Sequence, residues 1–164
     1  AVESPHANHV LQRIIEVLPC SLRKFVSEEL CGAGVAVSRH RYGCRVICRL
    51  LEHQGDGNAE ASGAEAALVE ELVEGLSALI RHEFGRHVAS SILEHSSEDH
   101  RAQVAAVLGE NTLSHAMNRS ASYIVEQALK FCRDEDRDMI AGQLLADLDN
   151  VLLLSRSQAG SHVV

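Results

Sequence analysis

Two cysteines lie four residues apart in the stretch YGCRVICRLLEH (residues 42–53), where Cys44 and Cys48 flank Arg45. Residues with this spacing share one face of a helix, so the pair could act as a redox couple or supply two ligands to zinc. A structural zinc takes about four ligands, and no other Cys or His pair is spaced to complete the set. The five cysteines are odd in number and contain no CxxC pair, which favours a reducing compartment. We therefore predict no metal and no cofactor.

A second candidate for chemistry is HEFGRH (residues 82–87), which is close to the metalloprotease pattern HExxH. The second histidine comes one residue too late, so the two histidines fall on different helical faces, and Gly85 starts a new helix there. Phosphate-binding, dinucleotide-binding and nucleophile-elbow motifs do not occur in the sequence. We predict that the protein is not an enzyme and has no small-molecule substrate.

The composition indicates a single helical domain. The chain has 164 residues, 46% of them hydrophobic, with two prolines and 3% aromatic residues. No apolar run approaches the roughly 18 residues of a membrane span, so no membrane association is expected. The sequence begins with Ala1 rather than Met and stops at Val164 inside an apolar pattern, which suggests a piece of a longer protein.

The stretch around Cys44 recurs along the chain. Its copies are ANHVLQRIIE (7–16), GCRVICRLLE (43–52), GRHVASSILE (85–94), ASYIVEQALK (121–130) and the shorter GSHVV (160–164). Counted from Asn8, Cys44, Arg86, Ser122 and Ser161, which we call position 0, the spacings are 36, 42, 36 and 39 residues. We attribute the longest spacing to a surface loop inserted at residues 53–66, which is rich in Gly, Ala and acidic residues.

Each copy follows one helical pattern. Positions +2, +3, +6 and +7 are apolar and fall in an arc of roughly 140° at about 100° per residue. Positions 0, +1 and +4 form a separate face. Position −1 is always Gly or Ala, which would let the start of the helix pack closely against a neighbour.

Further amphipathic stretches separate the copies. We expect long helices at 22–30, 100–108 and 137–145 and shorter ones at 35–40, 76–82, 113–119 and 151–157. Three helices in each repeat of about 36 to 40 residues predict an all-α fold, a superhelical α-solenoid, with apolar surface exposed at both ends. The expected units are 1–31, 32–74, 75–110, 111–146 and 147–164.

The repeated motif resembles the second helix of repeats in the Pumilio (PUF) family, in which a small residue precedes Ser, Asn or Cys, a flat side chain and two apolar residues. Asn8-His9…Gln12, Cys44-Arg45 and Ser122-Tyr123…Glu126 fit this pattern. YGCRVI, FGRHV and SYIVEQALKF are also similar to Pumilio sequences. The order of motifs resembles repeats four to eight, the C-terminal half of an eight-repeat array.

The resemblance implies that the chain binds single-stranded RNA, one base per repeat. The side chains expected to contact base edges are Asn8, Gln12, Cys44, Cys48, Arg86, Ser90, Ser122, Glu126 and Ser161. Flat side chains at position +1 are expected to stack between bases; they are His9, Arg45, His87, Tyr123 and His162.

Individual repeats imply individual bases. By the same resemblance, Asn8 with Gln12 reads uracil and Ser122 with Glu126 reads guanine. The pair Cys44 and Cys48 departs from the adenine pattern, which has Gln at +4, and Arg86 with Ser90 is also off the family code. Since the family binds RNA antiparallel to its repeats, the implied sequence is 5′-N-G-N-(A/N)-U-3′.

The charge distribution bears on partners. A net charge of −8 argues by itself against nucleic-acid binding. We expect cations on or beside the motif face, at Arg13, Arg45, Arg49, Arg86 and Lys130, with acidic residues in loops and outer helices. The resemblance implies mRNA 3′ untranslated regions as targets, protein effectors as further partners, and a cytoplasmic protein, with nucleus and nucleolus as alternatives. The competing interpretation is a degenerate Pumilio-like or armadillo-like scaffold that binds proteins or structured RNA with little sequence specificity.

Overall fold

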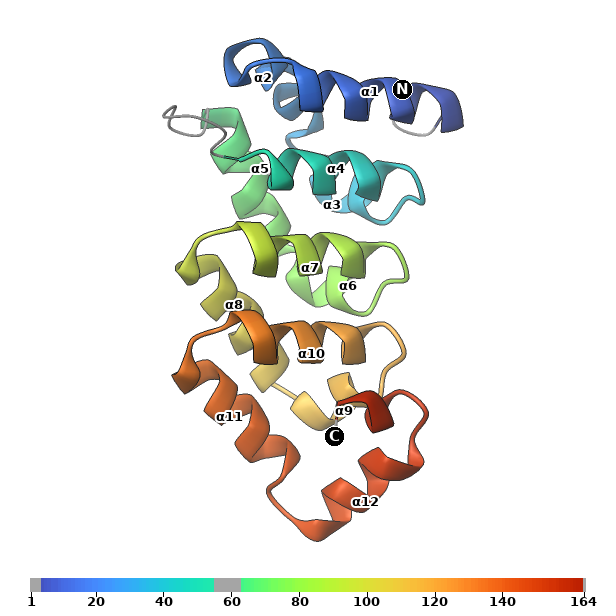
Figure 1. The fold of residues 1–164 in the computed structure, drawn as a ribbon, viewed down its shortest axis with the longest axis vertical. Coiled ribbons are helices and arrows are strands. Elements are labelled where there is room, and N and C mark those ends of the chain that lie inside the picture. The colour runs from blue at the N-terminus through green and yellow to red at the C-terminus, as the bar shows by residue number, and fades with distance from the viewer. Residues whose placement is uncertain (1–3, 55–62, 164) are drawn as a thin grey trace.

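Helices account for all regular secondary structure in the part of the chain that the computed structural model describes, residues 4–54 and 63–163. Four helices that carry the repeated motif, here called the motif helices, stack side by side in one layer (Figure 1). They are α1 (Pro5–Val17), α4 (Gly43–Glu52), α7 (Gly85–His95) and α10 (Ala121–Phe131). The 3₁₀ helix η1 (Gly160–His162) packs beside α10 and begins the fifth copy.

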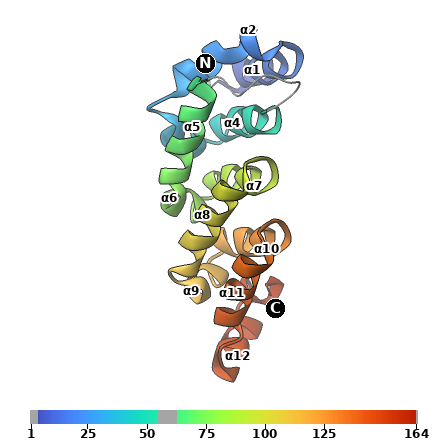
Figure 2. The ribbon, with the colours of Figure 1, turned by 90° about the vertical axis from the view of Figure 1, so that its left-hand side faces the viewer.

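The remaining helices form the second layer, which Figure 2 shows edge-on beside the motif helices. The longer ones are α2 (Cys20–Leu30), α5 (Gly63–Glu74), α8 (Glu98–Gly109) and α11 (Asp134–Leu144). The others are α3 (Gly34–Ser38), α6 (Leu76–Ile80), α9 (Thr112–Ala116) and α12 (Leu148–Arg156). Each connecting helix predicted from the sequence is therefore present, with ends that differ by up to three residues, and the all-α solenoid is confirmed.

The apolar positions of the motif build a continuous core. All four are buried in α4 and in α7, where Ile47 and Ile92 are fully inaccessible. Their burial supplies the main driving force for stacking one repeat on the next, about 25 cal/mol per Å² of apolar surface. In α10 three of the four are buried and Leu129 is half-buried. The pattern breaks in α1, the first motif helix, where Val10 is 60% exposed because no helix of the described chain covers that side.

The small residue at position −1 permits a close approach between helices. A Cβ atom added to Gly43 would lie 2.4 Å from the carbonyl oxygen of Val37, and one added to Gly85 would lie 2.9 Å from that of Leu79. In both units the first turn of the motif helix thus rests against the backbone of the preceding short helix. The expectation of close packing at this position is confirmed.

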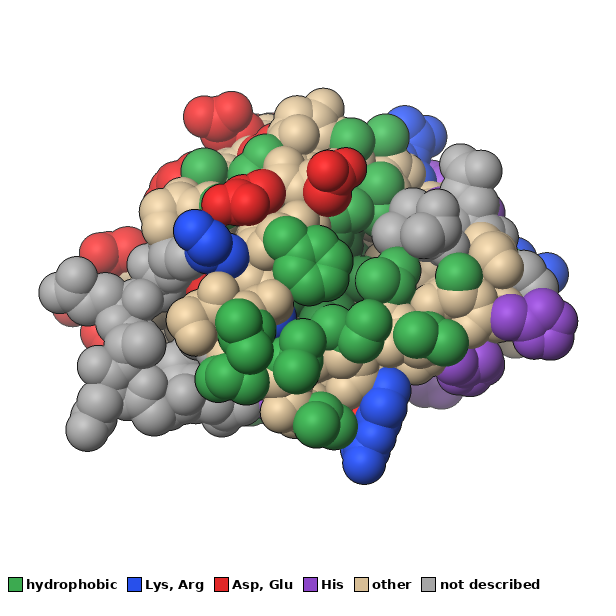
Figure 3. Space-filling view, turned by 90° about the horizontal axis from the view of Figure 1, so that it is seen from above, with side chains coloured by type: hydrophobic (Ala, Val, Ile, Leu, Met, Phe, Trp, Pro, Cys, Tyr) green, Lys and Arg blue, Asp and Glu red, His purple; other side chains and the backbone are tan. Residues whose placement is uncertain are grey.

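Both ends of the solenoid expose apolar side chains, as expected. Figure 3 shows the N-terminal end, where hydrophobic side chains gather over α1 and α2. The exposed residues there include Val10, Val17, Leu22 and Phe25. At the other end they are Leu145, Leu148, Leu152 and Leu153.

The predicted surface loop at 53–66 is wrong at its C-terminal end. Helix α5 begins at Gly63, so residues 63–66 are helical, and residues 55–62 lie outside the described residues. Two causes act together: Ala and Glu favour helix, and Glu65 is held in the interior 3.6 Å from the guanidinium of Arg23. Arg23 also donates to the carbonyl oxygens of Ile15 and His53. One buried side chain thus joins α1, the end of α4 and α5.

None of the described helices is both long and apolar enough to span a bilayer.

Candidate nucleic-acid interface

The flat side chains at position +1 all lie on the surface. His9, Arg45, His87, Tyr123 and His162 are exposed, although they flank buried positions in the sequence. Because they occupy equivalent places on helices stacked in one layer, they form a row that crosses the repeats. We call this row the +1 row. Its members point away from the core, which is the placement that base stacking requires.

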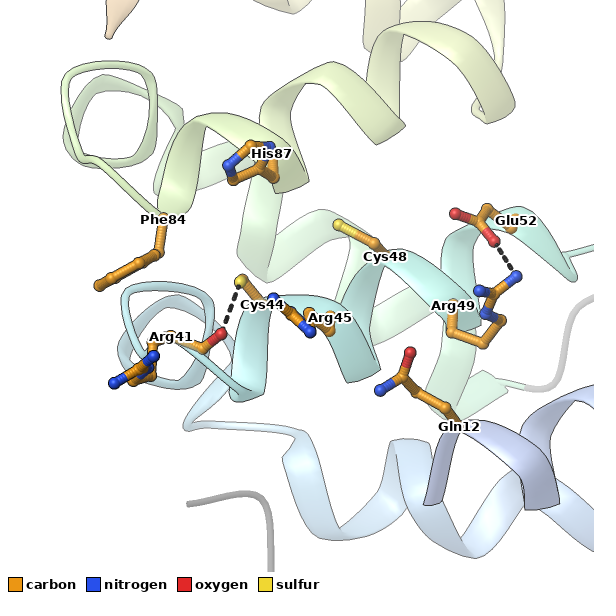
Figure 4. A pocket seen from close by; sticks show the side chains of 9 residues that line it. All are labelled: Gln12, Arg41, Cys44, Arg45, Cys48, Arg49, Glu52, Phe84 and His87. Atoms are coloured by element: carbon orange, nitrogen blue, oxygen red, sulfur yellow. Dashed lines mark hydrogen bonds and ion pairs between the residues drawn. The ribbon is translucent and has the colours of Figure 1, made fainter. Parts of the chain in front are cut away.

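A groove of about 380 Å³ runs across the first three motif helices (Figure 4). Five of the predicted contact residues line it: Gln12, Cys44, Arg45, Cys48 and His87. Its other lining residues are Arg41, Arg49, Glu52 and Phe84. In Figure 4 Cys48 and His87 border the space between α4 and α7, while Gln12 approaches from α1. The fold therefore brings these predicted residues from three repeats into one surface depression.

A second groove, of about 600 Å³, lies at the C-terminal end of the same face. It contains Ser122 and His162 together with Arg119. Other predicted residues lie outside both grooves. His9 borders an apolar depression that runs along α1 past Val10 and Ile14 to Val17, and Arg86 lines a smaller groove with Glu83 and Arg119.

The predicted base-edge residues are recessed. Cys44, Ser90 and Ser122 are 3%, 4% and 6% exposed, and Asn8 is fully buried. Helical geometry explains the difference from the +1 row: position 0 faces the neighbouring motif helix, whereas +1 is rotated by about 100° toward solvent. Glu126 is half-buried and Ser161 is exposed. The face thus has a floor of polar side chains below a raised row of flat ones.

Two of the predicted base-edge pairs are already hydrogen bonded. The Gln12 side-chain amide donates to the Oδ1 of Asn8, so these two carboxamides orient each other. In the third unit, Ser90 donates to a carboxylate oxygen of Glu94 at 3.2 Å. That bond occupies the hydroxyl hydrogen which a base acceptor would need.

The third unit departs from the others at position 0 as well. The guanidinium carbon of Arg86 lies 5.2 Å from the centroid of the Tyr123 ring, within the range of a cation–π contact. Arg86 therefore covers part of the surface of a predicted stacking platform. Although the side chain of His87 is exposed, partial desolvation by neighbouring atoms lowers its pKa, and the positive charges of Arg86 and Arg45 lower it further.

The thiols at Cys44 and Cys48 are poor nucleophiles at neutral pH. Burial raises the pKa of Cys44 and, with help from the neighbouring thiol, raises that of Cys48 to about 12. Nucleophilic attack requires the thiolate. The described residues contain no cluster of three side chains placed to hold a metal ion.

The sequence analysis missed the residues that start the motif helices. At position −4 of every unit a side chain accepts hydrogen bonds from backbone N–H groups of the first turn. These residues are Ser4, His40, His82, Asn118 and Ser157. The ring nitrogen Nδ1 of His82 accepts from Phe84 and Gly85 at 3.2 and 3.3 Å, and Oδ1 of Asn118 accepts two bonds at 3.0 Å. By fixing the first turn, these caps set the direction of positions 0 and +1.

The expected separation of charge is only partly correct. On the C-terminal halves of α1 and α4 the cations are neutralised by acidic residues on the same face: Arg49 lies 3.4 Å from Glu16 and 2.6 Å from Glu52. Arg13 also pairs with Glu16 at 2.9 Å, and this bond lowers the pKa of that carboxyl. In the sequence the two arginines are at position +5 and the two glutamates at position +8. Helical geometry places both positions on the same side of the helix as position +1.

Stacked helical units with a shared surface row define the molecule as a repeat α-solenoid. The family model for the Pumilio-family RNA binding repeat matches residues 4–31, 35–57, 78–108 and 116–145. These matches cover more than half of the chain, which therefore belongs to the Pumilio family. The resemblance seen in the motifs is confirmed.

Solved structures of this fold include the Puf4 RNA binding domain bound to an HO endonuclease RNA 3′ UTR recognition sequence (TM-score 0.84, 18% identity). Others are PUF-8 in complex with PBE-RNA (0.86, 21%) and the Puf3 RNA binding domain bound to a Cox17 RNA 3′ UTR recognition sequence (0.85, 24%). Each alignment covers 99% of this chain and 48%, 47% and 50% of the other chain, respectively. The chain thus spans about half the length of these relatives. A comparison with curated protein sequences gives no match.

Proposed function

We propose that the chain binds single-stranded RNA along the face of the motif helices, with bases stacked against the +1 row and base edges directed at the floor. The observation that carries the proposal is that all five +1 side chains are flat and exposed on equivalent positions of stacked helices. Membership of a family of RNA-binding repeats and the RNA complexes of its structural neighbours support it.

The proposed recognition sequence is 5′-N-G-N-(A/N)-U-3′, read antiparallel to the repeats. Ser122 and Glu126 would read G, because a carboxylate accepts from N1–H and N2–H₂ of guanine. Asn8 and Gln12 would read U, with Gln12 making the contact and the fully buried Asn8 orienting its amide through their mutual hydrogen bond. The unit with Cys44 and Cys48 would be permissive, because protonated thiols are weak hydrogen-bonding groups.

The third unit would not read a base edge. Arg86 is committed to the Tyr123 ring and Ser90 to Glu94, so neither presents a free group in the position that the family code uses. We propose that the corresponding nucleotide is accepted without discrimination. The biological targets proposed are mRNA 3′ untranslated regions, bound in the cytoplasm, in post-transcriptional control.

Fluorescence anisotropy with short labelled RNAs tests this proposal. Tyr123→Ala should weaken binding by about 5- to 150-fold, which corresponds to about 1–3 kcal/mol for one lost stacking contact. Glu126→Gln should weaken binding to RNA with G at the second position and leave RNA with A there nearly unchanged. Glu135→Gln, on the exposed surface of α11, is the matched charge control and should bind like the parent.

Binding that is absent, or equal for all RNAs and unaffected by Tyr123→Ala and Glu126→Gln, would refute the proposal. That result would favour the scaffold interpretation. Circular dichroism of each variant shows whether the helical fold is retained, so a loss of binding is assigned to the surface rather than to unfolding.

A further inference from the structure

Exposed arginines are concentrated in one kind of segment, the turns that lead from a short helix into a motif helix. Five of the chain's 15 Lys and Arg residues lie in these turns or at the helix end that enters one. We call them the connector arginines: Arg39, Arg41, Arg81, Arg119 and Arg156. All five are exposed. Only one acidic residue, Glu83, accompanies them in the turns at 39–42, 81–84, 117–120 and 157–159.

The connectors lie along one edge of the motif face. In Figure 1 the turns that enter α4, α7, α10 and η1 are all at the right-hand side, whereas the turns that leave the motif helices are at the left. The left-hand edge is acidic, with exposed carboxylates where the motif helices end and α8 and α11 begin. They include Glu52, Glu94, Glu98, Asp99, Asp134 and Glu135. The face is therefore polarised from a basic edge to an acidic edge.

Pairing distinguishes the cations of the two edges. On the acidic edge Arg133 lies 2.7 Å from Glu98, and Arg137 lies 3.1 Å from Asp134. Within the described residues, no carboxylate lies within 4.0 Å of any connector arginine. A cation without such a partner has its full charge available to a ligand and loses no ion pair on binding.

Two connector arginines reach the grooves of the motif face. Arg41 lines the groove that contains Cys44 and Cys48, and Arg119 lines the two grooves on either side of α10. These two side chains therefore lie at the border between the motif face and the basic edge. A ligand that stacks bases on the +1 row would carry its charged backbone to one side of that row.

Building on the proposed function, we infer that the phosphodiester backbone of bound RNA follows the connector edge, with Arg41 and Arg119 as phosphate contacts. The bases then extend inward from this edge across the face. This arrangement reconciles a net charge of −8 with a polyanionic ligand, because the local potential along the path of the phosphates is positive. It also separates two tasks. The connector arginines would bind the phosphates of any strand, and the polar side chains on the floor of the motif face would discriminate between bases.

The salt dependence of binding tests this assignment. For single-stranded nucleic acid, each lost phosphate contact lowers the slope of log K against log salt concentration by about 0.7. The variant R41Q/R119Q should thus lower the slope by about 1.4, so its loss of affinity between about 50 and 200 mM salt should be about sevenfold smaller. Its preference between G-containing and A-containing RNA should equal that of the parent.

The matched control is R133Q/R137Q, which removes the same charge from the acidic edge and should leave the slope unchanged. A parent slope retained in R41Q/R119Q, or a slope lowered equally by the control pair, would overturn the phosphate assignment while base-selective binding by the parent persisted. Absence of RNA binding by the parent itself would instead refute the proposed function, and this inference with it. All four arginines are exposed, so circular dichroism should show an unchanged fold.

Discussion

Replacement of one capping side chain tests whether position −4 fixes the start of the motif helices. In α7 the cap is His82, whose Nδ1 accepts from two backbone N–H groups. His82→Ala removes both bonds and leaves two donors of the first turn without their acceptor. His82→Asn keeps a side-chain oxygen at that place, as Asn118 does in the next unit. The two variants thus differ in the acceptor while sharing the loss of the ring.

The expected effect follows from the energetics of helix caps. Loss of one N-cap acceptor costs about 0.5–2 kcal/mol, and because two donors lose their acceptor here we expect about 1–2 kcal/mol for His82→Ala. With a urea m-value of about 2 kcal/mol/M, the unfolding midpoint should fall by about 0.5–1 M. His82→Asn should stay within about 0.5 kcal/mol of the parent. Urea unfolding followed by circular dichroism at pH 7.5 measures all three proteins.

The cap in α7 is also sensitive to pH. Burial first, and then the charge of Arg39, lower the pKa of His82, against a smaller opposing effect of Glu83. A folded-state pKa below the unfolded value of about 6.5 means that the neutral ring is stabilising. That contribution is complete above about pH 6.5 and is lost as the pH falls through the folded-state pKa, since a protonated Nδ1 no longer accepts.

The parent should therefore lose stability relative to His82→Asn between pH 7.5 and pH 5. Comparison of these two proteins at each pH cancels the titration of the other groups. Equal midpoints for His82→Ala and His82→Asn at pH 7.5 would show that the acceptor contributes nothing. A difference between parent and His82→Asn that stays constant across this pH range would refute the protonation argument.

Other predictions concern packing, the buried ion pair and thiol reactivity. Gly85→Ala should destabilise the fold by about 1–3 kcal/mol, because the new Cβ would collide with backbone atoms of a neighbouring helix. Gly142 is a helical position with open space around a new Cβ, so Gly142→Ala should stabilise the fold by about 0.5–1 kcal/mol. Urea midpoints compare the pair, and equal shifts would contradict the close-contact argument. Arg23→Ala should cost about 3–5 kcal/mol, because it removes a buried guanidinium that lies 3.6 Å from the buried carboxylate of Glu65. A loss below about 1 kcal/mol would refute this. Alkylation at pH 8, read by mass spectrometry, should modify exposed Cys31 well before Cys48, whose pKa is about 12; equal rates would contradict burial of that thiol.

Periodicity predicted the motif helices well because it acts within one unit. The apolar positions of α4 and α7 are buried as the 3.6-residue repeat requires, and the exposure of the +1 row follows from the same geometry. Helix α5 was not among the predicted helices, because Gly and acidic residues before and at its start suggested a loop. The ion pair that holds Glu65 inside comes from α2, some 40 residues earlier, and no local pattern contains that information.

The caps show a different limit. The capping residues differ in type, but each has a side-chain atom that can accept a hydrogen bond. They are Ser4, His40, His82, Asn118 and Ser157. A comparison by residue similarity does not group them, although their fixed distance from position 0 was visible in the sequence. The contact of Arg86 with Tyr123 was hidden for another reason: it joins two repeats, whereas the repeat alignment compares positions within each one. Structure was needed wherever function depends on contacts between units.

The polarised face also predicts how RNA binding should depend on salt at low salt concentrations. A motif helix of 10 or 11 residues places the acidic edge about 16 Å from the connector edge, at about 1.5 Å per residue. At 150 mM salt the Debye length is about 8 Å, so phosphates near Arg41 and Arg119 are largely screened from the acidic residues. At 10 mM it is about 30 Å, and repulsion from the acidic edge then acts on the bound strand. The increase in affinity on lowering the salt should therefore flatten below about 30 mM, where the Debye length exceeds the width of the face. Neutralising the far edge in E94Q/E98Q/D99N should restore a straight log–log plot, and a parent plot that is already straight down to 10 mM would refute this account of the charge distribution.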